Sequence, residues 1–349
     1  MKLAIISDIH VGKRLYRTDE NGYNKYEQLG YKALSQYADI IIKNKPDLVI
    51  NAGDIFEVAN PTALAITKYY QFQVSLKDIP TMTILGNHDF DFKNRRTKCS
   101  AAQIIDHTYF ADYEIKSVEI DNILFIMMPY IYDTDENIAK YLQSCQDIAS
   151  ESNCSKKILI THGVTERYYK ESLIGDKMML SDELVGLFDL VIIGHIHTPY
   201  NYKQGKTLVI SPGAMIDYQA YEDRTGPIFL DTDNMKFEKI KVKTPHIIKK
   251  NCTEKDINDV LSSITEDIYH ITYKGDANEI NNDLFIKAKN IAVNLVIDVF
   301  EDDVSDNEEE SESTLLGLLD WVNTNYPDYS AVFRQVMEGD TIDCTTENI

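Results

Sequence analysis

Short hydrophobic runs separated by longer, partly polar segments fill the first 230 residues. The runs are rich in Ile, Val and Leu, and they comprise Lys2–Ser7, Asp47–Asn51, Thr81–Leu85, Lys157–Ile160, Leu190–Ile193 and Leu208–Ser211. Continuous apolar runs of this length are typical of strands that are buried on both faces. The segments between them, such as Tyr26–Lys43 and Pro61–Lys77, are long enough for crossover helices. The pattern therefore predicts an α/β fold.

Polar side chains follow these hydrophobic runs, at the points where the predicted strands end. They are Asp8, His10, Asp54, Asn87, His88, Asp89, His162, His195 and His197. Open α/β sheets bind their ligands beyond the carboxyl ends of the strands. We therefore expect side chains from five separate strands to meet at one site.

The pattern changes between residues 240 and 300. Candidate strands at Ile240–Val242, Ile268–Tyr273 and Ala292–Phe300 alternate with helical stretches at Glu254–Ser262 and Glu279–Lys289, which indicates a small α+β domain. Glu301–Ser313 holds eight acidic residues and no basic one, as expected for a solvated linker. Beyond this linker, two short helices are predicted. The patterns divide the chain into residues 1–235, 236–300, 301–313 and 314–349.

The net charge of −21 is concentrated near the end of the sequence. Residues 300–349 carry 14 acidic side chains and one basic side chain, Arg334, which leaves −8 on the first 299 residues. Such a chain does not attract a polyanion as a whole, so a nucleic-acid substrate would require metal ions, local basic patches or a partner. The five scattered cysteines and the absence of long apolar stretches favour a cytoplasmic protein that does not enter a membrane.

Seven of the strand-end residues are of the types that bind divalent cations: Asp8, His10, Asp54, Asn87, His162, His195 and His197. Carboxylate and amide oxygens bind hard divalent metals, and imidazole suits manganese, iron and zinc. Two metals about 3.5–4 Å apart require a bridging ligand, which Asp54 could supply. The pairs Asp8-x-His10 and His195-x-His197 could each bind one ion or contribute to two. The remaining histidines, His107, His246 and His270, lie outside these motifs, and we expect ordinary roles for them.

The motifs Asp8-x-His10, Gly53-Asp54, Gly86-Asn87-His88-Asp89, His162 and Gly194-His195-x-His197 resemble the calcineurin-like metallophosphoesterase superfamily. Within it, Gly53-Asp54-Ile55-Phe56-Glu57, the Gly226–Leu230 run and the acidic linker resemble the SbcD-type nuclease subunits of DNA repair and recombination, especially those of bacteriophages. The resemblance implies a two-sheet β-sandwich flanked by helices, a smaller α+β capping domain at 236–300, and C-terminal partner-binding helices. If the chain is phage-encoded, its compartment is the host cytoplasm.

The resemblance also implies roles for individual residues. Asp8, His10 and His197 would hold a first metal, Asn87, His162 and His195 would hold a second, and Asp54 would bridge them. The expected ions are manganese, with magnesium as the alternative. His88 would protonate the leaving oxygen, and Asp89 would orient His88. An imidazole that titrates near neutrality suits this role.

DNA is the leading candidate substrate, cleaved by exonuclease action on double-stranded ends and by endonuclease action. Basic residues near the metal motifs could contact its phosphates: Lys13, Arg14, Arg17, Lys93, Arg95 and Arg96. The alternatives are a small-substrate phosphodiesterase or a nucleotidase of the same superfamily, or an inactive fold that serves as a scaffold. Protein phosphatases are disfavoured, because their Gly-Asp typically continues Asp-Arg-Gly, whereas Gly53-Asp54 continues Ile-Phe-Glu.

The predicted C-terminal helices are amphipathic and resemble a docking element. Their apolar residues are Leu315, Leu316, Leu318, Leu319, Trp321 and Val322. The resemblance implies that they bind the coiled-coil base of an SbcC-like ATPase, and that the chain forms a homodimer within a heterotetramer. Packing against the chain's own body is the alternative.

Overall fold

The computed structural model describes residues 1–15, 22, 24–89, 101–105, 107–168, 178–217 and 226–300. The chain divides into two units, Met1–Phe300 and Glu301–Ile349, and the second unit lies wholly outside the described residues. The acidic linker and the predicted C-terminal helices are in that second unit. None of the helices among the described residues is long and apolar enough to cross a membrane.

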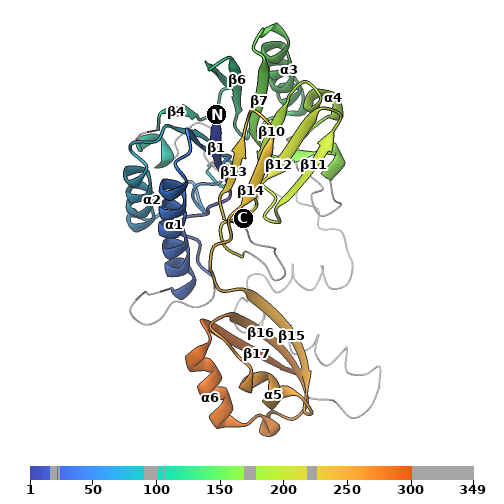
Figure 1. The fold of residues 1–349 in the computed structure, drawn as a ribbon. Coiled ribbons are helices and arrows are strands. Elements are labelled where there is room, and N and C mark those ends of the chain that lie inside the picture. The colour runs from blue at the N-terminus through green and yellow to red at the C-terminus, as the bar shows by residue number, and fades with distance from the viewer. Residues whose placement is uncertain are drawn as a thin grey trace, which may run out of the picture. The chain divides into compact units, whose positions relative to one another are not determined.

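Two six-stranded sheets form the body of the first unit (Figure 1). The first sheet has the order β14 (Lys236–Lys239), β13 (Ile228–Asp231), β1 (Lys2–Ile6), β2 (Leu48–Asn51), β3 (Thr81–Ile84) and β4 (Tyr109–Ala111). The second has the order β11 (Tyr200–Gln204), β12 (Thr207–Ser211), β10 (Leu190–Gly194), β7 (Lys156–His162), β6 (Ile123–Met128) and β5 (Lys116–Ile120). The predicted two-sheet fold is confirmed.

Strand side chains alternate between two apolar layers. Leu3 and Ile5 of β1 pack into the core between the sheets, whereas Ala4 and Ile6 pack into the core beneath the helices. The helices α1 (Lys25–Asn44) and α2 (Ala63–Ser75) share that second core. On the other sheet, α3 (Asp135–Glu151) and α4 (Asp182–Val185) cover the outer face. Because both faces of each sheet are covered, the strands read as continuous apolar runs rather than as alternating ones.

Local sequence signals begin the two crossover helices. The Asn24 side chain accepts a hydrogen bond from Glu27 N (3.0 Å) at the start of α1. Thr62 accepts one from Ala65 N (3.2 Å) at the start of α2. Side-chain oxygens at these N-cap positions satisfy backbone donors that a helix leaves unpaired. The predicted ranges Tyr26–Lys43 and Pro61–Lys77 are thus close to the observed helices.

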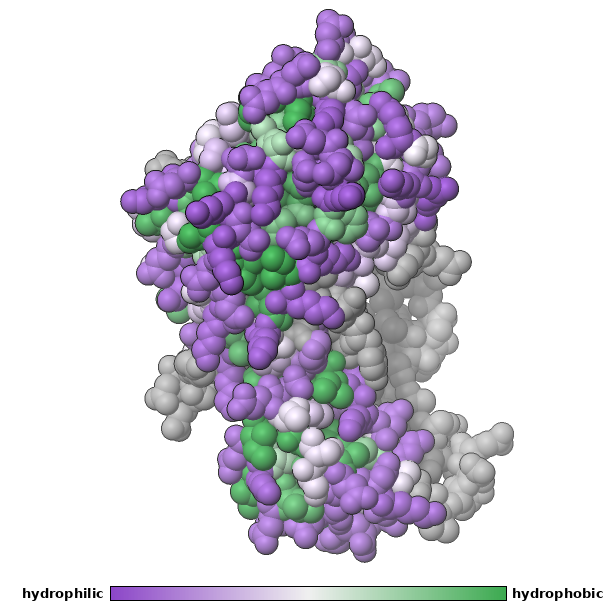
Figure 2. Space-filling view, in the orientation of Figure 1, coloured by the Kyte–Doolittle hydropathy of each residue, from purple (hydrophilic) through white to green (hydrophobic). Residues whose placement is uncertain are grey.

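Smaller elements complete the body. They are the β-pair β8 (Val164–Thr165) and β9 (Met179–Leu180), and the short 3-10 turns η1 (Ala101–Ile104) and η2 (Glu166–Tyr168). Hydrophilic side chains cover most of the visible face of the described residues, with smaller apolar areas between them (Figure 2).

A three-stranded parallel sheet follows the body, with the order β15 (Ile247–Thr253), β16 (Ile268–Lys274) and β17 (Asn294–Phe300). It has its own core with α5 (Ile257–Ser262) and α6 (Asn282–Ile291), and η4 (Ala277–Glu279) precedes α6. The predicted strand at Ile240–Val242 is wrong. Ile240 and Val242 pack against the core of the body, and the first strand of the small sheet begins only at Ile247.

Candidate metal centre

The strand-end residues meet at the carboxyl ends of β1, β2, β3, β7 and β10. The parallel register aligns Ile6 with Asn51 and Asn51 with Thr83, so the loops that follow these three strands leave the first sheet at one edge. In the second sheet, Gly194 lies opposite His162. The two edges face each other, since the Asp8 carboxylate accepts a hydrogen bond from His195 N (2.9 Å). Five loops far apart in sequence thus form one site.

Asp8, His10 and His197 form the first half of the site. The ligand atoms of these three side chains lie within 4.8 Å of one another. His10 Nε2 is 3.2 Å from His197 Nε2 and 3.5 Å from Asp54 Oδ2. Donor atoms about 2.0–2.2 Å from a shared ion are separated by at most about twice that distance, so the 3.2 Å between the two imidazole nitrogens fits one cation.

Asn87, His162 and His195 form the second half. Asn87 Oδ1 is 2.9 Å from His162 Nε2 and 2.9 Å from His195 Nδ1. The rings of His162 and His195 meet edge to face, with centroids 5.3 Å apart. One amide oxygen and two imidazole nitrogens therefore converge on one point from β3, β7 and β10.

Asp54 lies between the two halves. Its Oδ2 is 3.5 Å from His10 Nε2 and 3.4 Å from His162 Nε2, and its Oδ1 accepts a hydrogen bond from His88 N (2.8 Å). Burial disfavours the ionised carboxylate, but the surrounding imidazoles, His162 first, hold the pKa of Asp54 well below its usual range. A buried carboxylate that stays ionised between two imidazole groups is suited to bridge two cations.

The two halves place their buried imidazoles in different electrostatic surroundings. Burial lowers the pKa of His10, and the facing Glu57 and Asp54 carboxylates offset this only in part. Burial would also lower the pKa of His162, but the adjacent Asp54 carboxylate outweighs it and raises the pKa to about 9. The Asp54 carboxylate therefore favours positive charge at this position, carried either by a protonated His162 or by a bound cation.

Strained backbone brings these side chains together. Among the described residues, eight non-glycine residues have a positive φ, and four of them belong to the site: Asp8, His10, Asp54 and His195. Left-handed backbone is unfavourable for such residues, and it is concentrated at functional sites. The turns that follow the strands thus hold these ligands in conformations that the rest of the fold must stabilise.

Gly53 and Gly86 allow the loops to approach closely. Gly53 has φ +95°, and a Cβ there would lie 2.6 Å from His162 Nδ1 and 2.9 Å from Gly86 N. A Cβ on Gly86 would collide with the Asp54 carboxylate and backbone. Glycine precedes these ligands because no larger residue fits between the strand ends.

His88 lies at the open side of the first half. Its side chain is 35% exposed, and its ring meets the His10 ring edge to face, with centroids 4.8 Å apart. His88 Nδ1 lies 2.8 Å from the Glu57 carbonyl oxygen. A carbonyl only accepts hydrogen bonds, so this contact assigns the proton to Nδ1 and directs Nε2 to the opposite side of the ring.

The prediction that Asp89 orients His88 is wrong. Asp89 is fully buried, and its carboxylate accepts hydrogen bonds from the backbone N–H groups of Ile55, Phe56 and Gly86 at 3.0–3.1 Å. Burial and the nearby Asp54 charge raise the pKa of Asp89 to about 7 despite these donors. Asp89 therefore ties the loop after β2 to the loop after β3, and it does not reach the His88 ring.

Glu57 is the residue that sequence reasoning missed. Its carboxylate lies 3.1 Å from His10 Nδ1 and 2.5 Å from Lys13 Nζ, and it is 4.0 Å from His88 Nδ1. Metal-binding imidazoles commonly donate their second N–H group to a carboxylate or a carbonyl. The signal in the sequence is the position of Glu57, three residues after Asp54 and at the end of the Gly53–Glu57 motif.

The predicted DNA-binding cations that the structure describes are already paired. Lys13 pairs with Glu57, and Arg14 Nε lies 3.0 Å from the buried Glu27 carboxylate. Arg17, Lys93, Arg95 and Arg96 lie outside the described residues, as do all of the predicted partner-binding residues. Within the part of the chain that the structure describes, the histidines expected to be ordinary, His107, His246 and His270, belong to none of the groups that could hold a metal ion.

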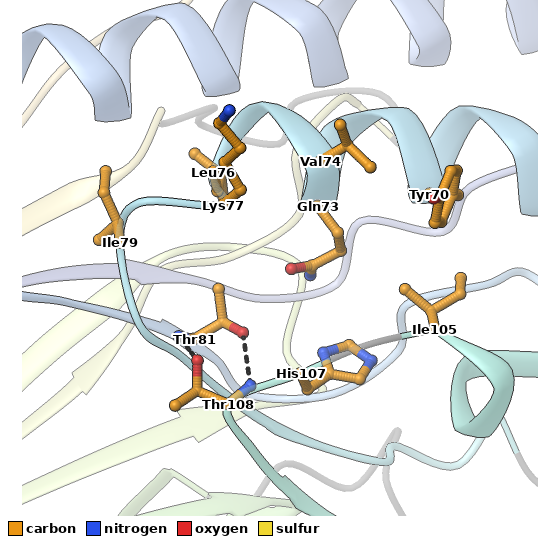
Figure 3. A pocket seen from close by; sticks show the side chains of 10 residues that line it. All are labelled: Tyr70, Gln73, Val74, Leu76, Lys77, Ile79, Thr81, Ile105, His107 and Thr108. Carbon is orange, nitrogen blue, oxygen red and sulfur yellow. Dashed lines mark hydrogen bonds between the residues drawn. The ribbon is translucent and has the colours of Figure 1, made fainter.

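A cavity of about 320 Å³ lies elsewhere, between α2 and the segment 105–108. Gln73 and His107 point into it from opposite sides, and Thr81 and Thr108 form two hydrogen bonds at 3.1 and 3.3 Å (Figure 3). None of the predicted metal ligands lines this cavity. The chemistry of the strand ends, rather than the size of this cavity, therefore identifies the candidate site.

Comparison with known proteins agrees with this geometry. Residues 1–199 match the model of the calcineurin-like phosphoesterase family, which is more than half of the chain, and the chain belongs to this family. The ligand atoms of Asp8, His10 and His197 lie within 4.8 Å of one another, as do those of Asp8, Asp54 and His162, and these donor types fit the divalent metal ions on which such a centre depends.

Two curated relatives are named as DNA-processing proteins. The chain is 29% identical over 235 residues to a "DNA double-strand break repair protein Mre11" of Saccharolobus solfataricus, covering 65% of this chain and 57% of the relative. It is 26% identical over 261 residues to the SbcD component of the nuclease SbcCD of Staphylococcus epidermidis, covering 67% of each. The chain thus spans little more than half the length of the first relative.

Among solved structures, the chain resembles one described as a novel archaeal phosphodiesterase. The TM-score is 0.37 at 18% identity, covering 69% of this chain and all of the other. This likeness carries no argument about function.

Proposed function

We propose that this chain is the nuclease subunit of a DNA repair or recombination machine, and that it hydrolyses phosphodiester bonds with two divalent cations. The observation that carries the proposal is the position of Asp54 Oδ2, 3.5 Å from His10 Nε2 and 3.4 Å from His162 Nε2. The relatives named Mre11 and SbcD support DNA as the substrate.

Each protein group has one task in this reaction. Asp8, His10 and His197 would hold one ion, Asn87, His162 and His195 the other, with Asp54 between them. When bound, such a pair of ions activates a water and neutralises the phosphoryl oxygens. Manganese is proposed over magnesium because four of the seven ligands are imidazoles, and nitrogen ligands favour a transition metal ion over magnesium, which prefers oxygen ligands.

His88 would donate the proton to the leaving oxygen. Its Nδ1 is held by the Glu57 carbonyl at 2.8 Å, so the free Nε2 is the atom that exchanges a proton with substrate. Its backbone N–H is anchored on Asp54 Oδ1. This couples the position of the proton donor to the carboxylate that the ions share.

The proposal is tested with the His88→Ala variant of the full chain on end-labelled duplex DNA with Mn²⁺. Loss of a general acid lowers the rate by about 10²–10⁴-fold, whereas both ions remain bound because no ligand is removed. His107→Asn is the matched control, and it keeps wild-type cleavage because His107 lines the cavity beside α2, which none of the predicted metal ligands lines. Cleavage rates and metal content by mass spectrometry are the measurements, and loss of an ion from His88→Ala contradicts the assigned role.

A small chromogenic phosphodiester separates the nuclease from a small-substrate enzyme of the same family. A nuclease cleaves the labelled duplex, either alone or with its ATPase partner. Hydrolysis of the small ester with no cleavage of DNA in either case would refute the DNA assignment. Comparing end-labelled linear DNA with closed circular DNA distinguishes exonuclease from endonuclease action.

The proposed partner is an SbcC-like ATPase, bound through residues 314–349, with the nuclease chain as a homodimer. The name of the Staphylococcus epidermidis relative is that of one component of a complex. The apolar residues of the helix predicted from the sequence are Leu315, Leu316, Leu318, Leu319, Trp321 and Val322. The domain at 236–300 would guide DNA to the site. Deleting 314–349 is expected to abolish co-purification with the ATPase while both ions stay bound, and unchanged co-purification would refute this role.

A further inference from the structure

The cations nearest the metal motifs are poorly placed to attract DNA. Lys13 Nζ is 2.5 Å from the Glu57 carboxylate, and the Lys13 side chain is only 16% exposed. Arg14 is paired with Glu27, a buried carboxylate. A cation whose charge is already balanced adds little net attraction for a phosphate. Cations without an acidic partner are therefore better candidates for a phosphate contact.

The segment that leaves the first sheet is unusually basic. Residues 236–250 contain one acidic residue, Glu238, and six lysines, namely Lys236, Lys239, Lys241, Lys243, Lys249 and Lys250. This local excess occurs in a chain whose formal net charge is −21. A concentrated basic stretch in an acidic protein can supply the local attraction that the overall charge opposes.

Lys239, Lys241 and Lys243, which we name the connector lysines, alternate with Ile240 and Val242. The two apolar residues pack against the core of the body, while Lys241 and Lys243 are exposed and Lys239 is half-buried. Within the described part of the chain, none of the three has a carboxylate within 4.0 Å. Alternating burial is typical of extended backbone, in which four residues span about 13 Å.

Strand register places the start of this row at the edge of the sheet that carries the metal centre. Lys239 pairs with Ile228 across β14 and β13, and Ile228 pairs with Ile5 across β13 and β1. Ile5 precedes Asp8 by three residues. Two strand spacings amount to about 10 Å, so Lys239 leaves the sheet beside the loop that holds the first half of the site.

We propose that the connector lysines bind the phosphate backbone of duplex DNA whose scissile phosphate lies at the metal centre. The inference rests on the proposed nuclease function and assigns the duplex a contact row outside the catalytic residues. Phosphates recur about every 3.4 Å of axis along each strand, so a row of about 13 Å spans roughly four of them. Such contacts hold the duplex without reading its sequence.

The test compares two triple variants of the full, metal-loaded chain. The connector variant is K239Q/K241Q/K243Q, and the control is K32Q/K43Q/K77Q, which makes the same charge change at exposed positions on α1 and just after α2, outside the 236–300 domain. Binding of a labelled phosphorothioate duplex, which resists hydrolysis, is measured between about 50 and 200 mM salt.

Each phosphate contact contributes about 0.9 to the slope of log affinity against log salt. The slope of the connector variant is expected to fall in magnitude by about 2–3, and that of the control to stay at the wild-type value. An unchanged slope in the connector variant, or an equal change in both variants, would overturn the inference. Equal melting temperatures exclude a folding defect as the cause.

Hydrolysis of a small chromogenic diester separates this inference from the proposed function. The small ester is too short to reach the connector, so the connector variant is expected to hydrolyse it at the wild-type rate. If the wild-type chain hydrolyses neither the diester nor DNA, the nuclease proposal fails, and the salt slopes still report on the connector. If both substrates are cleaved but the slopes do not differ, only the connector proposal fails.

Discussion

The two halves of the metal centre hold their key imidazoles by different means. His162 in the second half is fully buried, and its Nδ1 lies 2.8 Å from the Ala52 carbonyl oxygen. His10 in the first half directs its Nδ1 to the Glu57 carboxylate at 3.1 Å, which in turn pairs with Lys13. One imidazole is therefore oriented by the backbone and the other by a network of charged side chains.

The backbone contact makes the second half of the site rigid, whereas the side-chain contacts allow the first half to adjust. A strand-end carbonyl moves only if the sheet moves, so the second half is fixed by the fold. The first half depends on the side chains of His10, Glu57 and Lys13. It adjoins His88, whose side chain is 35% exposed. A catalytic centre needs a fixed template and a side that substrate can approach, and the two halves supply one each.

The largest expected effect comes from removing the charge that both halves share. Asp54→Asn keeps an oxygen for His88 N–H but loses the bridging carboxylate. The cations together provide several kcal/mol of transition-state stabilisation, so cleavage should fall by about a thousandfold or more. Metal analysis should show fewer than two ions per chain, whereas retention of both would mean that the halves bind independently of Asp54.

Gly53→Ala should affect the second half selectively. The new Cβ would lie 2.6 Å from His162 Nδ1, in a backbone with φ +95°. Left-handed backbone alone costs about 1–2 kcal/mol, so the free energy of unfolding should decrease by more than that amount. Calorimetric titration with Mn²⁺ should show one weakened binding event and one that is largely preserved.

Gly205→Ala is the matched control for this substitution. Gly205 also has a positive φ of 56°, but a Cβ there meets nothing within 4 Å. Gly205→Ala should therefore decrease the free energy of unfolding through its left-handed backbone, and it should leave the affinity for Mn²⁺ unchanged. Equal metal binding by the two variants would show that contact with His162 is unimportant.

Glu57→Gln should produce the smallest effect, confined to the first half. The amide keeps an oxygen beside His10 Nδ1, but it lacks the negative charge. Loss of such a supporting group typically lowers metal affinity or activity by about 10–100-fold. The Mn²⁺ binding event at the His10 half should be weakened while that at the His162 half is unchanged.

Lys13→Gln provides the control, because it removes the other partner of Glu57 and leaves the His10 contact intact. A partly exposed ion pair contributes about 0–1 kcal/mol, so metal binding should change little. If Lys13→Gln and Glu57→Gln weakened Mn²⁺ binding equally, the cation rather than the contact with His10 would explain the role of Glu57.

Strand prediction succeeded where burial made the pattern unambiguous. Runs such as Leu48–Asn51 are apolar on both faces, because one face packs between the sheets and the other packs against helices. Strand prediction failed at Ile240–Val242. There, apolar residues alternate with lysines, which is the pattern of a strand with one buried face. Ile240 and Val242 pack against the core of the body, but β14 ends at Lys239 and β15 begins at Ile247. Alternation alone does not distinguish a strand from an extended connector.

The sequence by itself determined the order of the buried strands and the side chains that follow them. Short-range signals are sufficient for this, because apolar runs report burial and the residues that end a strand adjoin it along the chain. The seven predicted metal ligands were identified on that basis and stay a prediction, and the structure brings their side chains together where the edges of the two sheets face each other.

Only the tertiary structure decided which side chains face one another in the site. Glu57 lies beside His10, and Asp89 accepts hydrogen bonds from three backbone N–H groups instead of contacting the His88 ring. Lys13 and Arg14 are paired with carboxylates, whereas the connector lysines have no acidic partner within the described residues. The physical reason is that ion pairs and hydrogen bonds depend on distances of about 3 Å between residues far apart in sequence. Strand register and the left-handed turns after the strands set those distances.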